Sequence, residues 1–108
     1  MKLHFYILEN HYREKPTFKC SECEVEEKPK TYKPVNRFPS GYYYSTVSKD
    51  NIGVVQGRYD RILILTEKDD ELAKRLLSES INKEIEYKNK EIEELQEKLD
   101  ALNEMVVK

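Results

Sequence analysis

The 108-residue sequence has only three glycines, and they form no run of the kind that cradles a phosphate group. Its two histidines both lie near the N-terminus, which leaves few side chains that act as general bases at neutral pH. Two cysteines are too few for the disulfide framework of a small secreted domain. No stretch approaches the roughly 20 apolar residues of a membrane span, and the N-terminal apolar run is too short for a signal peptide. We therefore expect a cytoplasmic, non-enzymatic protein without a cofactor.

The chain is poor in apolar residues and rich in charge. Charged residues make up 37% and hydrophobic residues 38%, whereas an average domain has about 25% and roughly 45–50%. Residues 1–66 carry a net charge of +3, all glycines and prolines, and seven of the eight tyrosines, while the remainder carries −5. This contrast predicts an α+β fold, with a small antiparallel β-sheet in a domain over residues 1–67 and a long C-terminal helix over residues 68–108.

Strands are expected throughout the first part. Leu3, Phe5 and Ile7 alternate with other largely apolar residues, which predicts a buried strand. All four prolines lie within residues 10–39, so strands there should be short or at a sheet edge. Apolar alternation changes phase across Ser21 and Glu22, which predicts a tight hairpin at these two residues.

Two later strands are expected from composition. Residues 42–47 are rich in tyrosine and β-branched side chains, and residues 62–65 form the clearest central strand. Between them, residues 48–51 followed by Gly53 predict a capped turn or short helix.

The helix is expected to begin at Thr66, because acidic side chains in the following turns complement the positive end of the helix dipole. Its first apolar stripe is wide and suited to packing on the sheet, and it consists of Leu72, Leu76, Leu77 and Ile81. From about residue 81 the stripe narrows to a seam whose spacings alternate between four and three residues. The a positions of this seam are Ile85, Ile92, Leu99 and Val106, and the d positions are Ile81, Lys88, Leu95 and Leu102.

Seven of these eight seam positions are apolar, which predicts a coiled coil. The predicted oligomerisation contacts are Ile81, Ile85, Ile92, Leu95, Leu99 and Leu102. Isoleucine at a with leucine at d favours a parallel dimer, although Lys88 disfavours deep burial at its d position. The flanking e positions offer no charges that would pair with g positions in a parallel dimer, so antiparallel pairing stays open, as does folding of the seam onto the chain's own sheet.

A Cys-x-x-Cys motif lies at Cys20 and Cys23, and with His4 and His11 it would supply the four ligands of a zinc site. The histidines precede the cysteines and do not match a standard second half of such a site. We therefore expect no bound metal. A thioredoxin-type redox role is also disfavoured, because Glu22 and Glu24 would raise the pKa of a nearby thiol.

Basic residues interleave with aromatic ones in the first part, a pattern found both in nucleic-acid-binding surfaces and in ordinary β-sheets. A net charge of +3 is far below that of a typical nucleic-acid binder. The residues expected to bind a ligand or partner are Arg37, Tyr42, Tyr44 and Arg58.

Three stretches resemble small uncharacterised proteins encoded by phages and prophages of low-GC Gram-positive bacteria. They are EKPKTYK at residues 27–33, VSKDNIG at residues 47–53, and DDELAK at residues 69–74 leading into a Glu/Lys/Leu-rich helix. The resemblance assigns no role to any residue. It implies a setting in which short, non-enzymatic proteins often antagonise host defence, acting in the host cytoplasm.

The sequence thus predicts a homo-oligomeric, phage-type binding protein that inhibits a host factor, a component of a defence system, by direct binding. A first alternative is an oligomeric sponge that sequesters a nucleotide second messenger in a pocket between protomers. A second alternative is a zinc-stabilised nucleic-acid-binding module.

Overall fold

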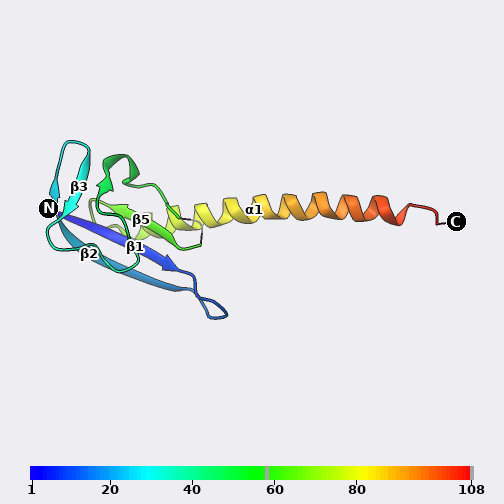
Figure 1. Cartoon of the computed structure of the whole chain (residues 1–108), viewed down its shortest axis with the longest axis horizontal. Coiled ribbons are helices and arrows are strands. Elements are labelled where there is room, and N and C mark those ends of the chain that lie inside the picture. Colours follow the sequence, from blue (N-terminus) through cyan, green and yellow to red (C-terminus); the bar gives the residue numbers. More distant parts are fainter. Residues whose placement is uncertain (58, 108) are drawn as a thin grey trace. The chain divides into compact units, whose positions relative to one another are not determined.

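The computed structural model describes residues 1–57 and 59–107, which form five strands and two helices (Figure 1). The elements are β1 (Lys2–Glu9), β2 (Thr17–Glu27), β3 (Thr31–Pro34), β4 (Val47–Ser48), the 3-10 helix η1 (Lys49–Asn51), β5 (Arg61–Leu65) and α1 (Asp70–Asn103). The strands form one antiparallel sheet in the order β4-β3-β2-β1-β5. The predicted α+β fold, a small antiparallel sheet followed by a long helix, is confirmed.

Strand β1 is buried on both faces, as its sequence predicts. It pairs with β2 on one side and with β5 on the other, and Figure 1 shows it between them. Leu3, Phe5 and Ile7 pack on one face with residues from the 32–47 region, while Tyr6 packs on the other face with β5 and the start of α1. All four side chains are at most 1% exposed. Apolar side chains on both faces therefore require cover on both sides.

The predicted hairpin at Ser21 and Glu22 is wrong, because β2 continues through both residues. The change in alternation has a different cause. Phe18 stacks against Tyr6 on the helix-facing side, at 6.2 Å between ring centroids, whereas Cys23 and Val25 belong to the cluster on the opposite face. Side chains therefore alternate regularly along β2. The apolar ones lie on the helix-facing side near Phe18 and on the opposite face at Cys23 and Val25.

Strand β2 also overturns the expectation of short or edge strands in the proline-rich segment. It has eleven residues and lies between β1 and β3. Pro16 precedes it and Pro29 follows it, so neither interrupts the backbone hydrogen bonds of the strand.

Strand β5 lies at the end of the sheet order and not at its centre. Its outer edge is nevertheless hydrogen-bonded, because the Gly53 N–H donates to the Ile64 carbonyl at 2.9 Å and Gln56 exchanges two backbone hydrogen bonds with Ile62. The bonded segment follows β4 and η1 directly, so the curled sheet has its two end strands joined by residues 49–56. This arrangement leaves β5 without a free edge on that stretch.

The predicted strand over residues 42–47 is found only at its last residue, where β4 begins. The Tyr42 N–H donates to the Pro39 carbonyl at 3.2 Å, and the Tyr42 hydroxyl donates to the Thr46 carbonyl at 2.7 Å. These two bonds fold the tyrosine segment back on itself. By contrast, the predicted short helix is present as η1, with the Ser48 hydroxyl accepting from the Asp50 N–H at 3.3 Å.

Helix α1 begins at Asp70, not at Thr66, and its cap is Asp69. The Asp69 carboxylate accepts from the Leu72 N–H at 3.0 Å, which satisfies one of the free amides at the helix start. Tyr6 fixes this point to the sheet: its hydroxyl accepts from the Asp69 N–H at 3.1 Å and donates to the Asp70 carboxylate at 2.8 Å. A contact between residues 63 positions apart therefore decides where the helix starts.

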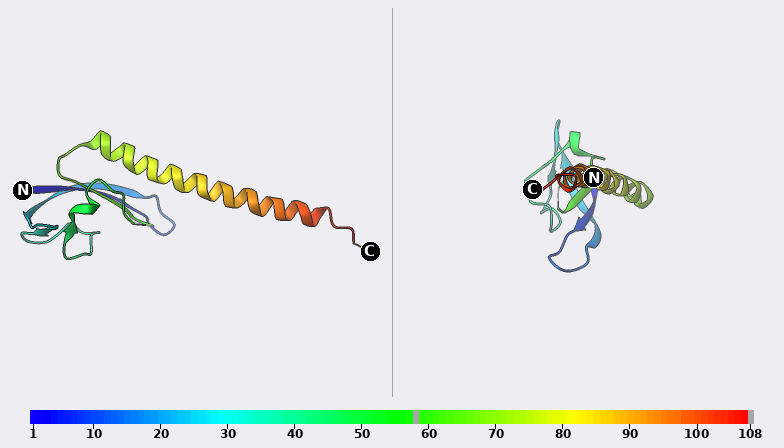
Figure 2. Two further views of the ribbon diagram at one scale, coloured as in Figure 1. Left: turned by 90° about the horizontal axis from the view of Figure 1, so that it is seen from above. Right: turned by 90° about the vertical axis from the view of Figure 1, so that its right-hand side faces the viewer.

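The chain forms two compact units, Met1–Leu77 and the remainder, so the first turns of α1 belong to the unit that contains the sheet. Figure 2 shows α1 as one unbroken helix. Within the sheet-bearing unit, Ala73 and Leu77 are buried against Tyr6, Leu63 and Leu65. The helix ends at Asn103, so Val106 of the predicted seam lies beyond it.

Replacing Tyr6 with phenylalanine should destabilise the protein. The change removes both hydrogen bonds of a hydroxyl on a ring that is 1% exposed, and we expect a loss of about 1–2 kcal/mol in the free energy of unfolding. Urea denaturation measures this. The matched control is Tyr12→Phe, on a ring that is 85% exposed, which should change stability by less than about 0.5 kcal/mol.

The same hydroxyl should make the free energy of unfolding depend on pH in the alkaline range. Burial, together with the hydrogen bond to Asp70, raises the pKa of Tyr6 from 10.0 to about 12. The folded state therefore holds this proton more tightly than the unfolded state, and the stabilisation is complete below pH 10 and is lost as the pH rises towards 12. Wild type should weaken over this range relative to Tyr6→Phe. Equal alkaline profiles, or unchanged stability of Tyr6→Phe at neutral pH, would contradict the role given to Tyr6.

Candidate functional site

The structure separates the residues that the sequence assigned to ligand or partner binding. Tyr42 and Tyr44 line one pocket, while Arg37 lines another. Arg58 lies outside the described residues. Arg37, Tyr42 and Tyr44 therefore do not form a single site.

The tyrosine pocket is an open hollow of about 380 Å³. It is lined by Tyr42, Tyr44, Ser45, Thr46, Ser48, Asn51 and Gln56. Tyr42 forms its base: it is only 8% exposed, and burial followed by the neighbouring Tyr44 raises the pKa of its hydroxyl. The Tyr44 ring lies 5.5 Å from that of Tyr42 and is 71% exposed, so it forms an accessible wall.

The lining of this pocket combines aromatic rings with hydroxyl and amide groups. None of the described residues that line it is charged. The chemistry suits a neutral hydrogen-bonding group or the side chains of a protein partner. Asn51 and Gln56 were not predicted as site residues, because they reach the pocket only through the curl of the chain between β4 and β5.

The arginine pocket has a volume of about 390 Å³. It is lined by Ser21, Glu22, Arg37, Phe38, Pro39 and Ser40. The Ser21 hydroxyl is buried and has no hydrogen-bond partner among the described residues. A hydrogen bond from Lys2, at 3.1 Å, lowers the pKa of Glu22 and keeps this carboxylate charged. This pocket therefore offers charges of both signs.

Phe38 connects the two pockets. Its ring lies 4.9 Å from that of Tyr42, edge to face, and 5.6 Å from that of Phe5 in β1. The segment that lines both pockets is thus anchored in the core through aromatic contacts.

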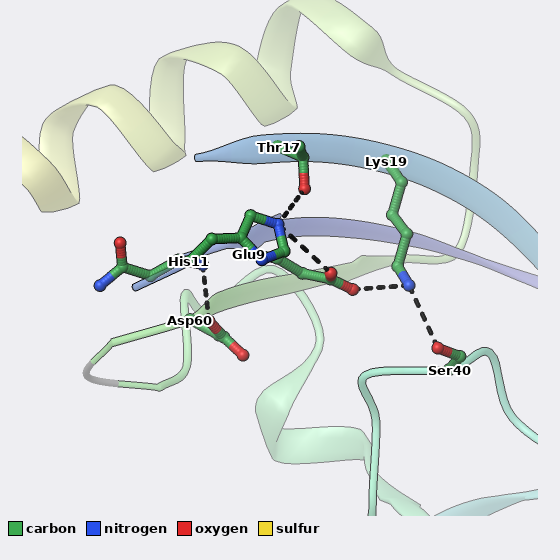
Figure 3. A network of polar contacts seen from close by, with 7 residues as sticks. Glu9, His11, Thr17, Lys19, Ser40 and Asp60 are labelled. Atoms are coloured by element: carbon green, nitrogen blue, oxygen red, sulfur yellow. Dashed lines mark hydrogen bonds and ion pairs between the residues drawn. The ribbon is translucent and has the colours of Figure 1, made fainter. Parts of the chain in front are cut away.

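A polar network lies where β1 ends and β2 begins (Figure 3). The His11 Nε2 is 2.7 Å from the Thr17 hydroxyl and 3.9 Å from the Glu9 carboxylate. A hydroxyl, an imidazole and a carboxylate in contact resemble a catalytic triad by composition. A triad, however, uses the two different ring nitrogens for its nucleophile and its carboxylate. Here one nitrogen faces both groups, so the imidazole cannot relay a proton between them.

Lys19 and Ser40 extend this network but add no base. The Lys19 ammonium is 2.6 Å from the Glu9 carboxylate and donates to the Ser40 hydroxyl at 3.3 Å (Figure 3). The Asn10 N–H donates to the Asp60 carboxylate at 2.7 Å on the other side. These contacts fasten the loop between β1 and β2, and the loops that contain Ser40 and Asp60, to the ends of the strands. They have a structural role.

The two cysteines lie on opposite faces of β2, because they are three positions apart along a continuous strand. Cys20 is exposed and Cys23 is buried, with its thiol donating to the Arg37 carbonyl at 3.4 Å. One metal ion cannot be bound by both. Among residues 1–57 and 59–107 there is no group of three or more potential metal ligands.

Most of the seam residues of α1 are exposed apolar side chains. Ile81 is half-buried. The exposed fractions of the others are 50% for Ile85, 61% for Ile92 and Leu95, 51% for Leu99 and 66% for Leu102. The Lys88 ammonium lies 4.0 Å from Glu84 on the preceding turn. These five side chains form an exposed apolar stripe along α1.

We expect one thiol of the folded protein to react rapidly with a thiol reagent such as Ellman's reagent. Cys20 is accessible, whereas burial, and to a lesser extent the charge of Glu24, raises the pKa of Cys23 and suppresses its reactive thiolate. Denaturant should expose the second thiol. The control is Cys20→Ser, which should show no rapid reaction; two fast thiols in the folded wild type would contradict the continuous strand.

Within the described part of the chain, no helix has the length and apolar character needed to cross a membrane. Comparison of the chain with family models, with curated proteins and with solved structures finds no match. Its function is therefore inferred from its own residues.

Proposed function

We propose that this chain is a non-enzymatic binding protein that self-associates through α1 and recognises its partner with the sheet-bearing unit. The observation that carries this proposal is the exposed apolar seam. Five side chains at heptad spacing, from Ile85 to Leu102, are each at least 50% exposed. Large contiguous apolar surfaces on soluble chains mark interaction sites, and this spacing is that of a helix that packs against another helix.

The sheet-bearing unit supports the second half of the proposal. Binding hot spots favour tyrosine and arginine in settings held by a rigid scaffold. Tyr43 and Tyr44 are 88% and 71% exposed, beside a core formed by Tyr42, Phe38 and Phe5. Outside its seam, α1 presents mainly Glu, Lys and Asn, and exposed ion pairs of such side chains contribute little to affinity.

The chemistry of the tyrosine pocket favours a protein as the partner. A nucleotide needs cationic groups around its phosphates, and no described residue of the tyrosine pocket supplies one. The polar network is arranged for structure, which supports a non-enzymatic role. The resemblance to phage proteins suggests a host protein, bound and inhibited by contact.

Substituting Ile92 and Leu99 with aspartate should convert an oligomer into monomers, because the change places charges at the centre of the seam. Light scattering coupled to size exclusion measures the mass. The matched control is Lys90→Asp with Glu97→Asp: it has the same spacing, the same new residues and the same change in net charge, but lies on the helix face opposite the seam. Its mass should equal that of wild type. A monomeric wild type at high micromolar concentration would refute self-association.

Partner binding should survive exchange of the helix. Replacing residues 81–108 with an unrelated coiled coil of the same oligomeric state preserves the sheet-bearing unit and any avidity. We expect immobilised chimera and wild type to retain the same proteins from a bacterial host lysate.

Tyr44→Ser should lose these proteins, and Tyr87→Ser, on an α1 tyrosine that is 65% exposed, should keep them. Loss of binding by the chimera alone would place recognition on the helix and contradict the proposed division of roles.

A further inference from the structure

We propose that the seam of one copy pairs with the seam of a second copy in the antiparallel direction, with Ile92 of each copy opposite Leu95 of the other. This inference rests on the self-association proposed above and adds the orientation and the register. In this arrangement the apolar stripe of α1 packs against a second copy of this chain.

The spacing of the seam supports an antiparallel register. The six seam positions from 85 to 102 are separated by three, four, three, four and three residues, a pattern that is the same in both directions. In an antiparallel coiled coil, a positions face d positions. With residue 92 opposite 95, Ile85 faces Leu102 and Lys88 faces Leu99, so every one of the six positions meets a seam residue.

Lys88 distinguishes the two orientations most clearly. A parallel dimer stacks Lys88 on Lys88 of the second copy in one layer, where two ammonium groups would be brought together and partly desolvated. In the antiparallel register Lys88 faces Leu99. Its aliphatic stem covers that leucine while its ammonium stays near Glu84, 4.0 Å away on its own helix and at the solvent edge.

The residues beside the seam are complementary only in the antiparallel register. In this orientation g positions face g positions, so Glu91 of each copy lies opposite Lys98 of the other. The e positions bring Asn89 opposite Gln96, and the two amides can hydrogen-bond to each other. In a parallel pair, g positions face e positions, and Glu91 would meet only the uncharged Gln96.

Moving the second copy by one heptad weakens this complementarity. In one direction Glu91 lies opposite Glu91 of the second copy and Leu102 lies opposite Ser78, although Glu84 then lies opposite Lys98 and Ile81 opposite Leu99. In the other direction Lys98 lies opposite Lys98, and Ile85 has no helical residue opposite it because α1 ends at Asn103. Each shift therefore brings one pair of like charges together and leaves Leu102 or Ile85 without an apolar partner, which favours the register with Ile92 opposite Leu95.

Distances between nitroxide spin labels in the full-length protein test the orientation. In a Cys20→Ala/Cys23→Ala background, Lys83→Cys and Glu94→Cys each carry one label per chain, well away from the seam. Residue 83 lies level with 104 of the second copy in the antiparallel register, so its two labels are offset along the axis by 21 residues, about 32 Å. The labels at 94 are nearly level. We expect the distance at 83 to exceed the distance at 94 by about 10 Å or more.

Each other outcome is informative. Equal distances at the two positions would indicate parallel pairing and overturn this inference while leaving self-association intact. Absence of a dipolar signal at both positions would overturn self-association itself. Circular dichroism and thermal unfolding of the labelled background establish that the two alanines preserve the fold.

A charge exchange tests the register independently. Lys98→Glu places two glutamate pairs across the antiparallel interface and should raise the dimer dissociation constant about threefold or more. Adding Glu91→Lys restores both opposite-charge pairs and should return the constant to near the wild-type value. If the double variant is no tighter than Lys98→Glu alone, the assigned register is wrong. Analytical ultracentrifugation at low salt measures all three proteins.

Discussion

The structure depends on one constraint: β1 has apolar side chains on both faces, and a sheet of five strands must hide both. One face is covered by the chain between Tyr32 and Ile52, which carries the aromatic residues of the core. The other face is covered by the first two turns of α1. The helix is therefore required by the sheet, but only as far as Leu77.

This requirement explains why α1 has two different apolar surfaces. Up to Leu77 its stripe is wide and buried by the sheet, since a helix that packs on a sheet presents a broad face. From Ile85 the stripe has the narrow heptad spacing that is typical of a helix packed against another helix. One helix thus carries a wide stripe that is buried within its own fold and a narrow stripe that, in our proposal, contacts a second chain.

Much of this arrangement can be predicted from sequence because hydrophobic period reports local burial. Hydrophobic period identified β1 and the long helix, while composition and turn residues identified β5 and η1. It failed at Ser21 and Glu22, because alternation cannot distinguish a hairpin from a strand whose covered face changes along its length. It failed at residues 42–46 because the Tyr42 hydroxyl bonds the Thr46 carbonyl and overrides the β propensity of tyrosine. It misplaced the helix start because the deciding partner, Tyr6, is distant in sequence.

The candidate site could be predicted only in part from the sequence, for the same reason. Tyr42 and Tyr44 are close in sequence and remain close in space, at 5.5 Å between rings. Asn51 and Gln56 join them through the curl of the sheet, which no local pattern encodes. Arg37 looked like a member of this group but lies in the neighbouring pocket, because Phe38 turns into the core between them.

The loop that lines both pockets is held by the sheet and not by the helix. Gly41 has φ of +101°, and a Cβ there would lie 3.3 Å from the Glu9 carboxylate and 3.4 Å from Ile7. Glu9 in turn is paired with Lys19, whose ammonium donates to Ser40 beside that glycine. Positive φ and close approach both favour glycine here, and the ion pair positions the loop from β1 and β2. Changes to the seam should therefore leave the pockets intact, which is the physical basis for our proposal that recognition and self-association lie in different parts of the chain.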